Sequence, residues 1–129
     1  MAVVGSAELA QGGDERRKFY LYCRQRGIWA SLVAGRSLAA EPDYIATFCP
    51  ARHVPADYPP TLLLHGDADN DVPVQQSIQM AQALQAAGVE YELRLLPGED
   101  HAFDLDLDRE SARQAFEAAL GFLDDHLKK

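Results

Sequence analysis

The sequence predicts an α/β protein in three layers, with a short parallel sheet flanked by helices, and three observations support this. An apolar run, Thr61 to Leu64, follows two prolines and is too short for a helix, which predicts a strand buried on both faces. Two amphipathic stretches with a period near 3.6 residues come later, at Val74 to Ala87 and after Asp108. Between them, Val89 to Leu96 alternates apolar and charged residues, as a half-buried strand does. Strands that alternate with helices favour right-handed crossovers and parallel pairing.

The start of the chain predicts one more strand and one helix. Ala2 to Gly5 is a short β-prone run that ends at glycine. Asp14 can cap a helix that runs from Glu15 to about Arg26, because its side-chain oxygen accepts from free N–H groups in the first turn. Gly27 is expected to end this helix, since glycine tolerates the left-handed conformation found after many helices.

Residues 28–57 show no sustained period. Short helices are expected near Trp29 to Val33 and Pro42 to Phe48. We interpret the segment as a cap or insertion over the carboxyl ends of the strands, and an ordinary helical connection over one face of the sheet is an equal alternative. The whole chain, residues 1–129, is expected to form a single domain.

Composition narrows the classes of function. Twelve basic and twenty acidic residues give a net charge of −8, which disfavours binding to nucleic acid or to a membrane surface. No apolar run is long enough to span a bilayer, and the N-terminus does not resemble a secretion signal. Cys23 and Cys49 belong to no disulfide framework, which favours a reducing, cytoplasmic setting and leaves a pairing between them open. No cofactor is predicted.

Two residues are the candidates for catalysis, Asp69 and His101. Each is expected in the loop after one of two successive parallel strands, so both are expected at the same edge of the sheet. An aspartate beside a histidine can fix the tautomer of the imidazole and stabilise the imidazolium that forms when the ring takes a proton.

The same two residues belong to a pair of linked motifs. The first is H-G-x-x-D-x-x-V-P from residue 65, and the second, after a helix and a strand, is G-x-x-H-x-F from residue 98. This arrangement resembles the C-terminal part of an α/β-hydrolase, in particular prolyl-oligopeptidase-like and dienelactone-hydrolase-like esterases and peptidases. The resemblance implies a partial α/β-hydrolase fold, with Asp69 as the acid and His101 as the base of a catalytic triad.

The sequence departs from that family at the nucleophile. Its serine lies on a G-x-S-x-G elbow before the acid, and no such elbow occurs here. Ser6 follows the first expected strand but has no glycine two residues later. The chain therefore resembles a hydrolase that lacks its nucleophile half, and we expect it to be inactive alone. Completed by another chain, it is expected to hydrolyse a small ester or peptide substrate.

Other interpretations remain beside this one. The chain is alternatively a non-catalytic binding or assembly module, and an autonomous hydrolase that uses Ser6 or a cysteine ranks lowest. The expected partner is a complementary N-terminal hydrolase half or a second copy of the chain. A homodimer would pair the Ala2 to Gly5 edges or pack exposed apolar faces together.

The remaining polar residues favour structural roles. His65 is interpreted as a structural histidine at a strand end, and both cysteines as packed or surface thiols. The acidic run from Asp67 resembles a calcium loop, but Val72 occupies the position that needs glycine and Ile78 the one that needs glutamate. The run from Asp104 fails in the same way, so no metal site is predicted.

Overall fold

A computed structural model describes residues 15–127, and its contacts divide the chain into two compact units, residues 1–48 and 49–129. The predictions for Ala2 to Gly5, Ser6 and Asp14 concern residues outside the described range. The boundary between the units falls inside residues 28–57, so this segment contributes to both. Its role as a cap stays a prediction.

The first unit contains three helices, α1 (Glu15–Gln25), α2 (Trp29–Ala34) and α3 (Pro42–Ala46), close to where the sequence predicts them. Helix α1 ends at Gly27, as expected, because this glycine has a φ of +65°. The N–H of Ile28 then donates to the carbonyl of Cys23 at 2.9 Å, which satisfies one of the last free carbonyls of the helix. The side chain of Cys23 is fully buried.

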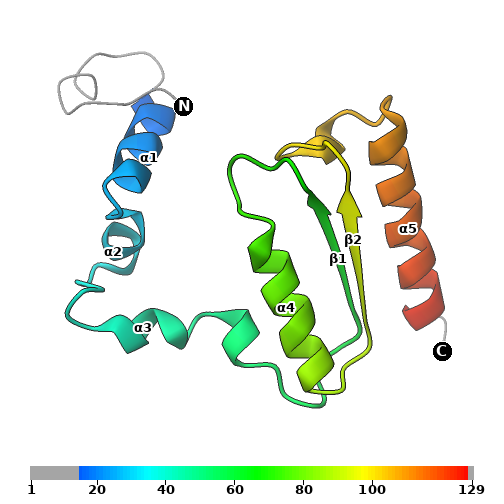
Figure 1. Ribbon diagram of the computed structural model, residues 1–129, viewed down its shortest axis with the longest axis horizontal. Coiled ribbons are helices and arrows are strands. Elements are labelled where there is room, and N and C mark those ends of the chain that lie inside the picture. The colour runs from blue at the N-terminus through cyan, green and yellow to red at the C-terminus, as the bar shows by residue number, and fades with distance from the viewer. Residues whose placement is uncertain (1–14, 128–129) are drawn as a thin grey trace. The chain divides into compact units, whose positions relative to one another are not determined.

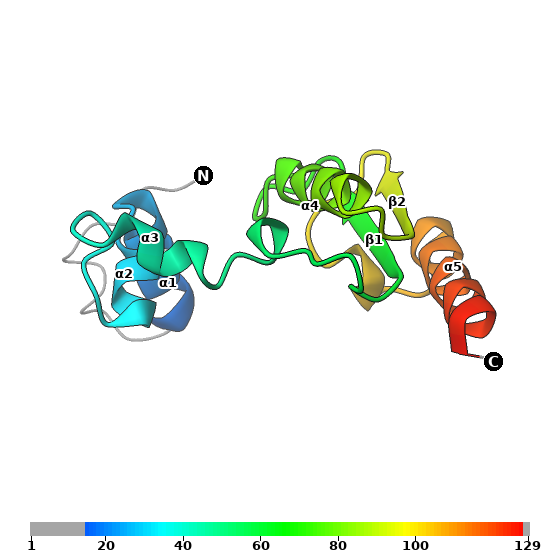
Figure 2. The same cartoon turned by 90° about the horizontal axis from the view of Figure 1, so that it is seen from below.

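The second unit is a short parallel sheet between two helices. Its elements are η2 (Pro50–Arg52), β1 (Thr61–Gly66), α4 (Gln75–Ala86), β2 (Tyr91–Leu96), η3 (Phe103–Leu105) and α5 (Glu110–Leu127). The two strands pair in parallel, with Thr61 opposite Tyr91 and Gly66 opposite Leu96. Helix α4 lies on one side of the strands and α5 on the other, as Figure 1 and the turned view in Figure 2 show. The predicted three-layer α/β architecture is confirmed.

The helices of this unit bury small or aliphatic side chains. Ala81 and Leu84 are buried on α4, and Ala112 and Ala115 on α5. Helix α4 ends in the motif that its sequence predicts, because Gly88 has a φ of +72°. The N–H of the following residue donates to the carbonyl of Leu84 at 3.0 Å.

Two details differ from the sequence-based expectation. Thr61 to Leu64 are only half-buried, whereas burial on both faces was expected, because the described sheet has just two strands to cover them. Helix α5 begins at Glu110, so Asp108 does not cap it. The residue before the helix is Arg109, whose guanidinium lies 2.8 Å from a carboxylate oxygen of the buried Glu99.

Within residues 15–127, no helix combines the length and the apolar character that a bilayer crossing requires.

Candidate functional site

The loop after β1 places the carboxylate of Asp69 by means of its own backbone. The N–H of Asp69 donates to the carbonyl of Gly66 at 3.2 Å, which closes a turn. Asp69 Oδ1 then accepts from the N–H groups of Asp71 at 2.7 Å and Val72 at 2.8 Å. One carboxylate oxygen is therefore used to hold the turn, and Oδ2 remains for another donor.

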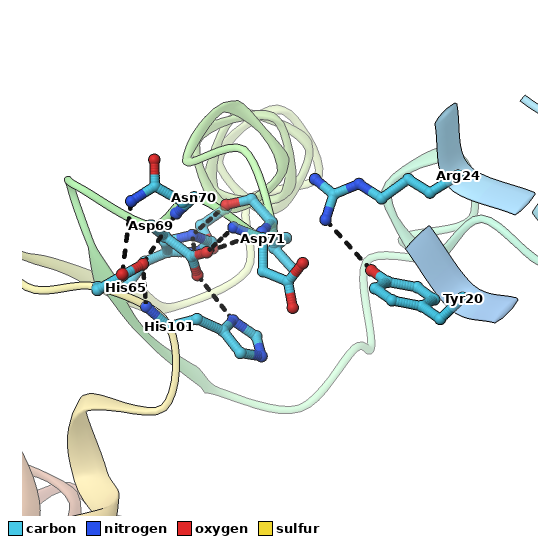
Figure 3. Close-up of polar contacts among 10 residues, drawn as sticks. Tyr20, Arg24, His65, Asp69, Asn70, Asp71 and His101 are labelled. Atoms are coloured by element: carbon cyan, nitrogen blue, oxygen red, sulfur yellow. Dashed lines mark hydrogen bonds and ion pairs between the residues drawn. The ribbon is translucent and has the colours of Figure 1, made fainter. Parts of the chain in front are cut away.

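That donor is His101, in the loop after β2. Its Nδ1 lies 3.0 Å from Asp69 Oδ2, and Figure 3 shows the ring beside the carboxylate. The side chain of Asp69 is 7% exposed and that of His101 is 51% exposed. The structure thus brings together the two residues that the sequence singled out, with the acid covered and the imidazole open to solvent. Their catalytic roles stay a prediction.

The electrostatics of the pair follow from these contacts. Burial raises the pKa of Asp69, but hydrogen bonds from the N–H of Val72, from His101 and from the N–H of Asp71 outweigh it and lower the pKa from 3.8 to about 2. The hydrogen bond to Asp69 in turn raises the pKa of His101 above its ordinary value. A carboxylate held ionised against an imidazole is the arrangement that stabilises an imidazolium.

The two loops are joined at several further points. Asp67 Oδ1 accepts from the N–H of Gly98 at 2.6 Å, beside the Asp69–His101 contact. The carboxylate of Asp100 accepts from the backbone N–H of Asn70 at 3.0 Å and from its side-chain amide at 3.4 Å. These residues hold the site together, and their partners lie about thirty positions away in the sequence. Of these residues, the sequence singled out only Asp67, as one of the carboxylates at alternate positions after the first strand.

The loop that carries His101 is also tied to the start of α5. The carboxylate of Glu99 is buried, and it accepts from the Ser111 hydroxyl at 2.6 Å and from the Arg109 guanidinium at 2.8 Å. Its backbone carbonyl lies so close to Gly66 that a Cβ on that glycine would come within 2.3 Å of the carbonyl oxygen. The glycine of the H-G motif is therefore needed for the close approach of the two loops.

An apolar cleft of about 750 Å³ adjoins the pair, between the end of β1 and helix α5. Asp69 and His101 contribute the polar part of its lining. The apolar part comes from β1, the η3 region and α5, in particular Leu64, Phe103, Leu107, Ala112, Phe116 and Ala119. A substrate or a protein segment in this cleft would contact the open side of the imidazole.

The other candidates lie elsewhere or outside the described residues. Cys23 and Cys49 are free thiols, and the first is buried with no exposed surface, so it cannot reach a substrate. Ser6 is not described. Over residues 15–127, no group of three or more His, Cys, Asp or Glu side chains is arranged to hold a metal ion.

Several solved structures resemble the chain. An acetyl ester-xyloside bifunctional hydrolase from Caldicellulosiruptor lactoaceticus superposes with a TM-score of 0.55 at 29% sequence identity, over 58% of this chain and 28% of that protein. A thermophilic esterase from Thermogutta terrifontis, bound to propionate, superposes with a TM-score of 0.55 at 33% identity, over 59% of this chain and 29% of the esterase. The chain therefore spans less than a third of the length of these enzymes.

Segments of much larger proteins are also similar. A non-reducing polyketide synthase from Aspergillus calidoustus is 49% identical over 49 residues, which are 38% of this chain and 2% of the synthase. A second one, from Aspergillus terreus, is 29% identical over 109 residues, which are 81% of this chain and 4% of the synthase. The chain spans only a few per cent of their length.

The sequence profile of the prolyl oligopeptidase family matches residues 29–129, which include both motifs, both strands and the Asp69–His101 pair. The α/β-hydrolase resemblance that these motifs suggest is confirmed by the esterase structures above. The chain therefore belongs to the prolyl oligopeptidase family.

Proposed function

We propose that this chain supplies the acid and the base of a serine esterase and receives its nucleophile from another polypeptide segment. The observation that carries the proposal is the 3.0 Å contact between Asp69 Oδ2 and His101 Nδ1, at the carboxyl ends of neighbouring parallel strands. In serine hydrolases a covered carboxylate in this position orients the histidine that activates the serine. Because Nδ1 faces the acid, Nε2 of the exposed ring is the nitrogen that exchanges protons with the reactants.

In the proposed reaction, a serine hydroxyl transfers its proton to His101 Nε2 while its oxygen attacks the ester carbonyl. Asp69 stabilises the resulting imidazolium. The imidazolium then donates its proton to the departing alcohol, which leaves an acyl ester on the serine. The same nitrogen next removes a proton from water, whose oxygen attacks the acyl group, and the acid product and the free serine are released. The donors for the oxyanion come from the segment that carries the serine.

An ester is the substrate class that the similar structures favour over a peptide. The solved neighbours described above are named as an acetyl ester hydrolase and an esterase. The apolar cleft beside His101 suits the acyl chain or the alcohol of a small ester, since it offers little to hydrogen-bond a peptide backbone. Both cysteines are free, which supports the further proposal of a reducing, cytoplasmic setting.

Complementation tests the proposal. The purified chain alone is expected to be nearly inert toward p-nitrophenyl acetate, because it lacks a G-x-S-x-G elbow and its oxyanion donors. Co-expression with the nucleophile-bearing part of the Thermogutta esterase is expected to give esterase activity. In that assembly Asp69→Asn is expected to lower kcat by up to about 10⁴-fold, whereas the exposed Asp57→Asn is expected to have no effect.

Two results would contradict the proposal. One is an esterase turnover by the chain alone that Ser6→Ala abolishes, which would show an autonomous enzyme. The other is an active assembly in which Asp69→Asn and His101→Ala have no effect, which would show that this pair does not take part.

A second candidate, a non-catalytic binding or assembly module, is favoured by the apolar cleft itself. A module of this kind requires the apolar cleft but not the Asp69–His101 pair. Binding of its partner is then expected to survive His101→Ala and to be lost with Phe116→Asp, a change in the lining of the cleft. Isothermal titration with the complementary hydrolase part distinguishes the two candidates when it is combined with the activity measurement.

A further inference from the structure

The carboxylate of Asp69 has a second imidazole beside it, that of His65. This residue is the penultimate one of β1, and only 9% of it is exposed. Its Nδ1 lies 2.7 Å from the hydroxyl oxygen of Ser77, and its Nε2 lies 3.0 Å from the carbonyl oxygen of Val72. The same Nε2 is 3.4 Å from Asp69 Oδ2, the oxygen that also faces His101 (Figure 3).

These partners select one tautomer of His65. A carbonyl oxygen can only accept a hydrogen bond, so Nε2 must carry a proton to bond Val72. In the neutral ring Nδ1 is then an acceptor, and the Ser77 hydroxyl, in the first turn of α4, donates to it. Every polar atom of the buried ring is satisfied in this state, and neither nitrogen remains for a substrate.

Val72 connects this ring to the acid. Its carbonyl accepts from His65, while its N–H donates to Asp69 Oδ1 at 2.8 Å. His65 therefore restrains the backbone at Val72, whose own N–H holds Oδ1 of the Asp69 carboxylate. The Nε2–H of His65 also lies next to Oδ2, the other oxygen of that carboxylate. Because the ring is enclosed, it cannot swing away without breaking both of its hydrogen bonds.

We propose that His65 is a positioning residue, which fixes the turn at Asp69 and keeps Oδ2 of that carboxylate directed at His101. The inference rests on the proposed function, since it assumes that Asp69 and His101 act as an acid–base pair. Ser77 belongs to the same device, because its hydroxyl sets the tautomer in which His65 donates toward Val72 and Asp69. The role differs from that of a purely structural histidine, whose loss would lower stability and leave the pair unchanged.

An alternative role for Ser77 as a nucleophile has less support. Ser77, His65 and Asp69 are the residue types of a triad, but Nε2 of the histidine lies closer to the Val72 carbonyl than to the aspartate. Ser77 is also absent from the lining of the cleft beside His101. We therefore assign its hydroxyl to the orientation of His65.

The test uses the full chain labelled with ¹⁵N and follows each imidazole by NMR across a pH titration. In the wild type we expect His65 as the Nε2–H tautomer and His101 with a pKa above its ordinary value. The Asp69→Asn variant gives the pKa of His101 in the absence of the Asp69 carboxylate. The charges of Asp71 and Asp100, which also face that ring, stay in place in this variant.

His65→Phe keeps an aromatic ring but removes both hydrogen bonds. We expect it to abolish most of the difference between wild-type His101 and His101 in the Asp69→Asn variant. His65→Gln retains an N–H donor for Val72 and is expected to restore most of that difference. The exposed His53→Phe is the matched control and is expected to leave the His101 titration unchanged.

The outcomes separate the inference from the proposed function. If Asp69→Asn does not change wild-type His101, the acid–base pair itself is wrong. If that change is present but a folded His65→Phe variant titrates like the wild type, the positioning role is wrong. Should His65→Phe fail to fold, Ser77→Ala decides: loss of the single tautomer of His65 together with a lower pKa of His101 supports the inference, and an unchanged tautomer and titration overturn it.

Discussion

Asp69 keeps its negative charge at a place where burial alone would favour the neutral form. Hydrogen bonds from the loop amides and from His101 outweigh the burial and hold the pKa near 2. The residue types at this point were predictable, because an acid and a histidine at neighbouring strand ends are expected to meet. The contact between His65 and Asp69 was not predictable. A histidine at a buried strand end has the same local sequence whether it contacts the acid or only fills space.

The pair has a pH range in which it stabilises the fold most. Asp69 has a lowered pKa when folded, so its contribution is present above about pH 4 and is lost as the pH falls toward 2. His101 has a raised pKa when folded, so its contribution is complete below about pH 6.5 and is lost as the pH rises through the folded value. We expect Asp69→Asn to lower the free energy of unfolding chiefly between these limits, as measured by urea unfolding over the pH range.

The control for this measurement is Asp57→Asn, which removes an exposed carboxylate. It is expected to change the unfolding free energy little at any pH. If Asp69→Asn lowered the free energy of unfolding equally at every pH, the stabilisation would not come from the charges of Asp69 and His101.

Ala102, directly after His101, has a φ of +58° and is the single described non-glycine residue in the left-handed region. This conformation costs an alanine roughly 1 kcal/mol more than a glycine, which offsets the greater freedom of glycine in the unfolded chain. Ala102→Gly is therefore expected to leave stability unchanged or to raise it slightly. Ala118→Gly, within α5, is expected to cost about 1 kcal/mol. Thermal unfolding measures both, and equal losses would contradict the strain at Ala102.

At the scale of elements, the periods of the sequence predict the helices and strands of residues 49–129 well. Apolar runs, alternation and glycine stops are local signals, and the ends of α4 and β2 follow from them. Helix α5 starts later than expected because Asp106, and not Asp108, holds the turn before it. The N–H of Asp108 donates to Asp106 Oδ1 at 3.1 Å and that of Arg109 to the Asp106 carbonyl at 3.2 Å. Several aspartates in one short stretch give the sequence no sign of which one closes the turn.

The close approach of the two loops gives a prediction for the end of β1. Gly66→Ala places a methyl group against the Glu99 carbonyl, so the loops must separate. We expect a loss of about 1–3 kcal/mol and a lower pKa of His101, because the separation weakens its contact with Asp69. Gly121→Ala on α5, where a Cβ meets open space, is the control and is expected to stabilise by up to about 1 kcal/mol. Equal effects of the two changes in urea unfolding would show that the loops are not tightly apposed.

At the scale of the whole molecule, the net charge favours a monomer, whereas the exposed apolar surface favours association. The net charge of −8 favours a well-solvated monomer. Helix α5 nevertheless exposes about half of the surface of Phe116, Leu120 and Leu123, a row with the spacing of one helix face. An amphipathic helix is predictable from sequence, but what covers its apolar face is not, because that depends on surfaces distant in the chain or in another molecule.

We expect this face to be covered by self-association when no complementary hydrolase part is present. Apolar patches of this kind seldom remain open to water, and a two-fold dimer lets one surface serve both copies. An interface of at least ~1,000 Å² is expected, since smaller ones are rarely stable. Sedimentation equilibrium should therefore give about twice the chain mass of 14.2 kDa at micromolar concentration. Leu120→Glu should shift the equilibrium to the monomer, because a charge in the interface would lose its hydration. Val33→Glu changes an apolar residue on α2 that is still more exposed, 70% against 50% for Leu120, and should leave the mass unchanged. A monomeric wild-type chain would contradict self-association through this face of α5.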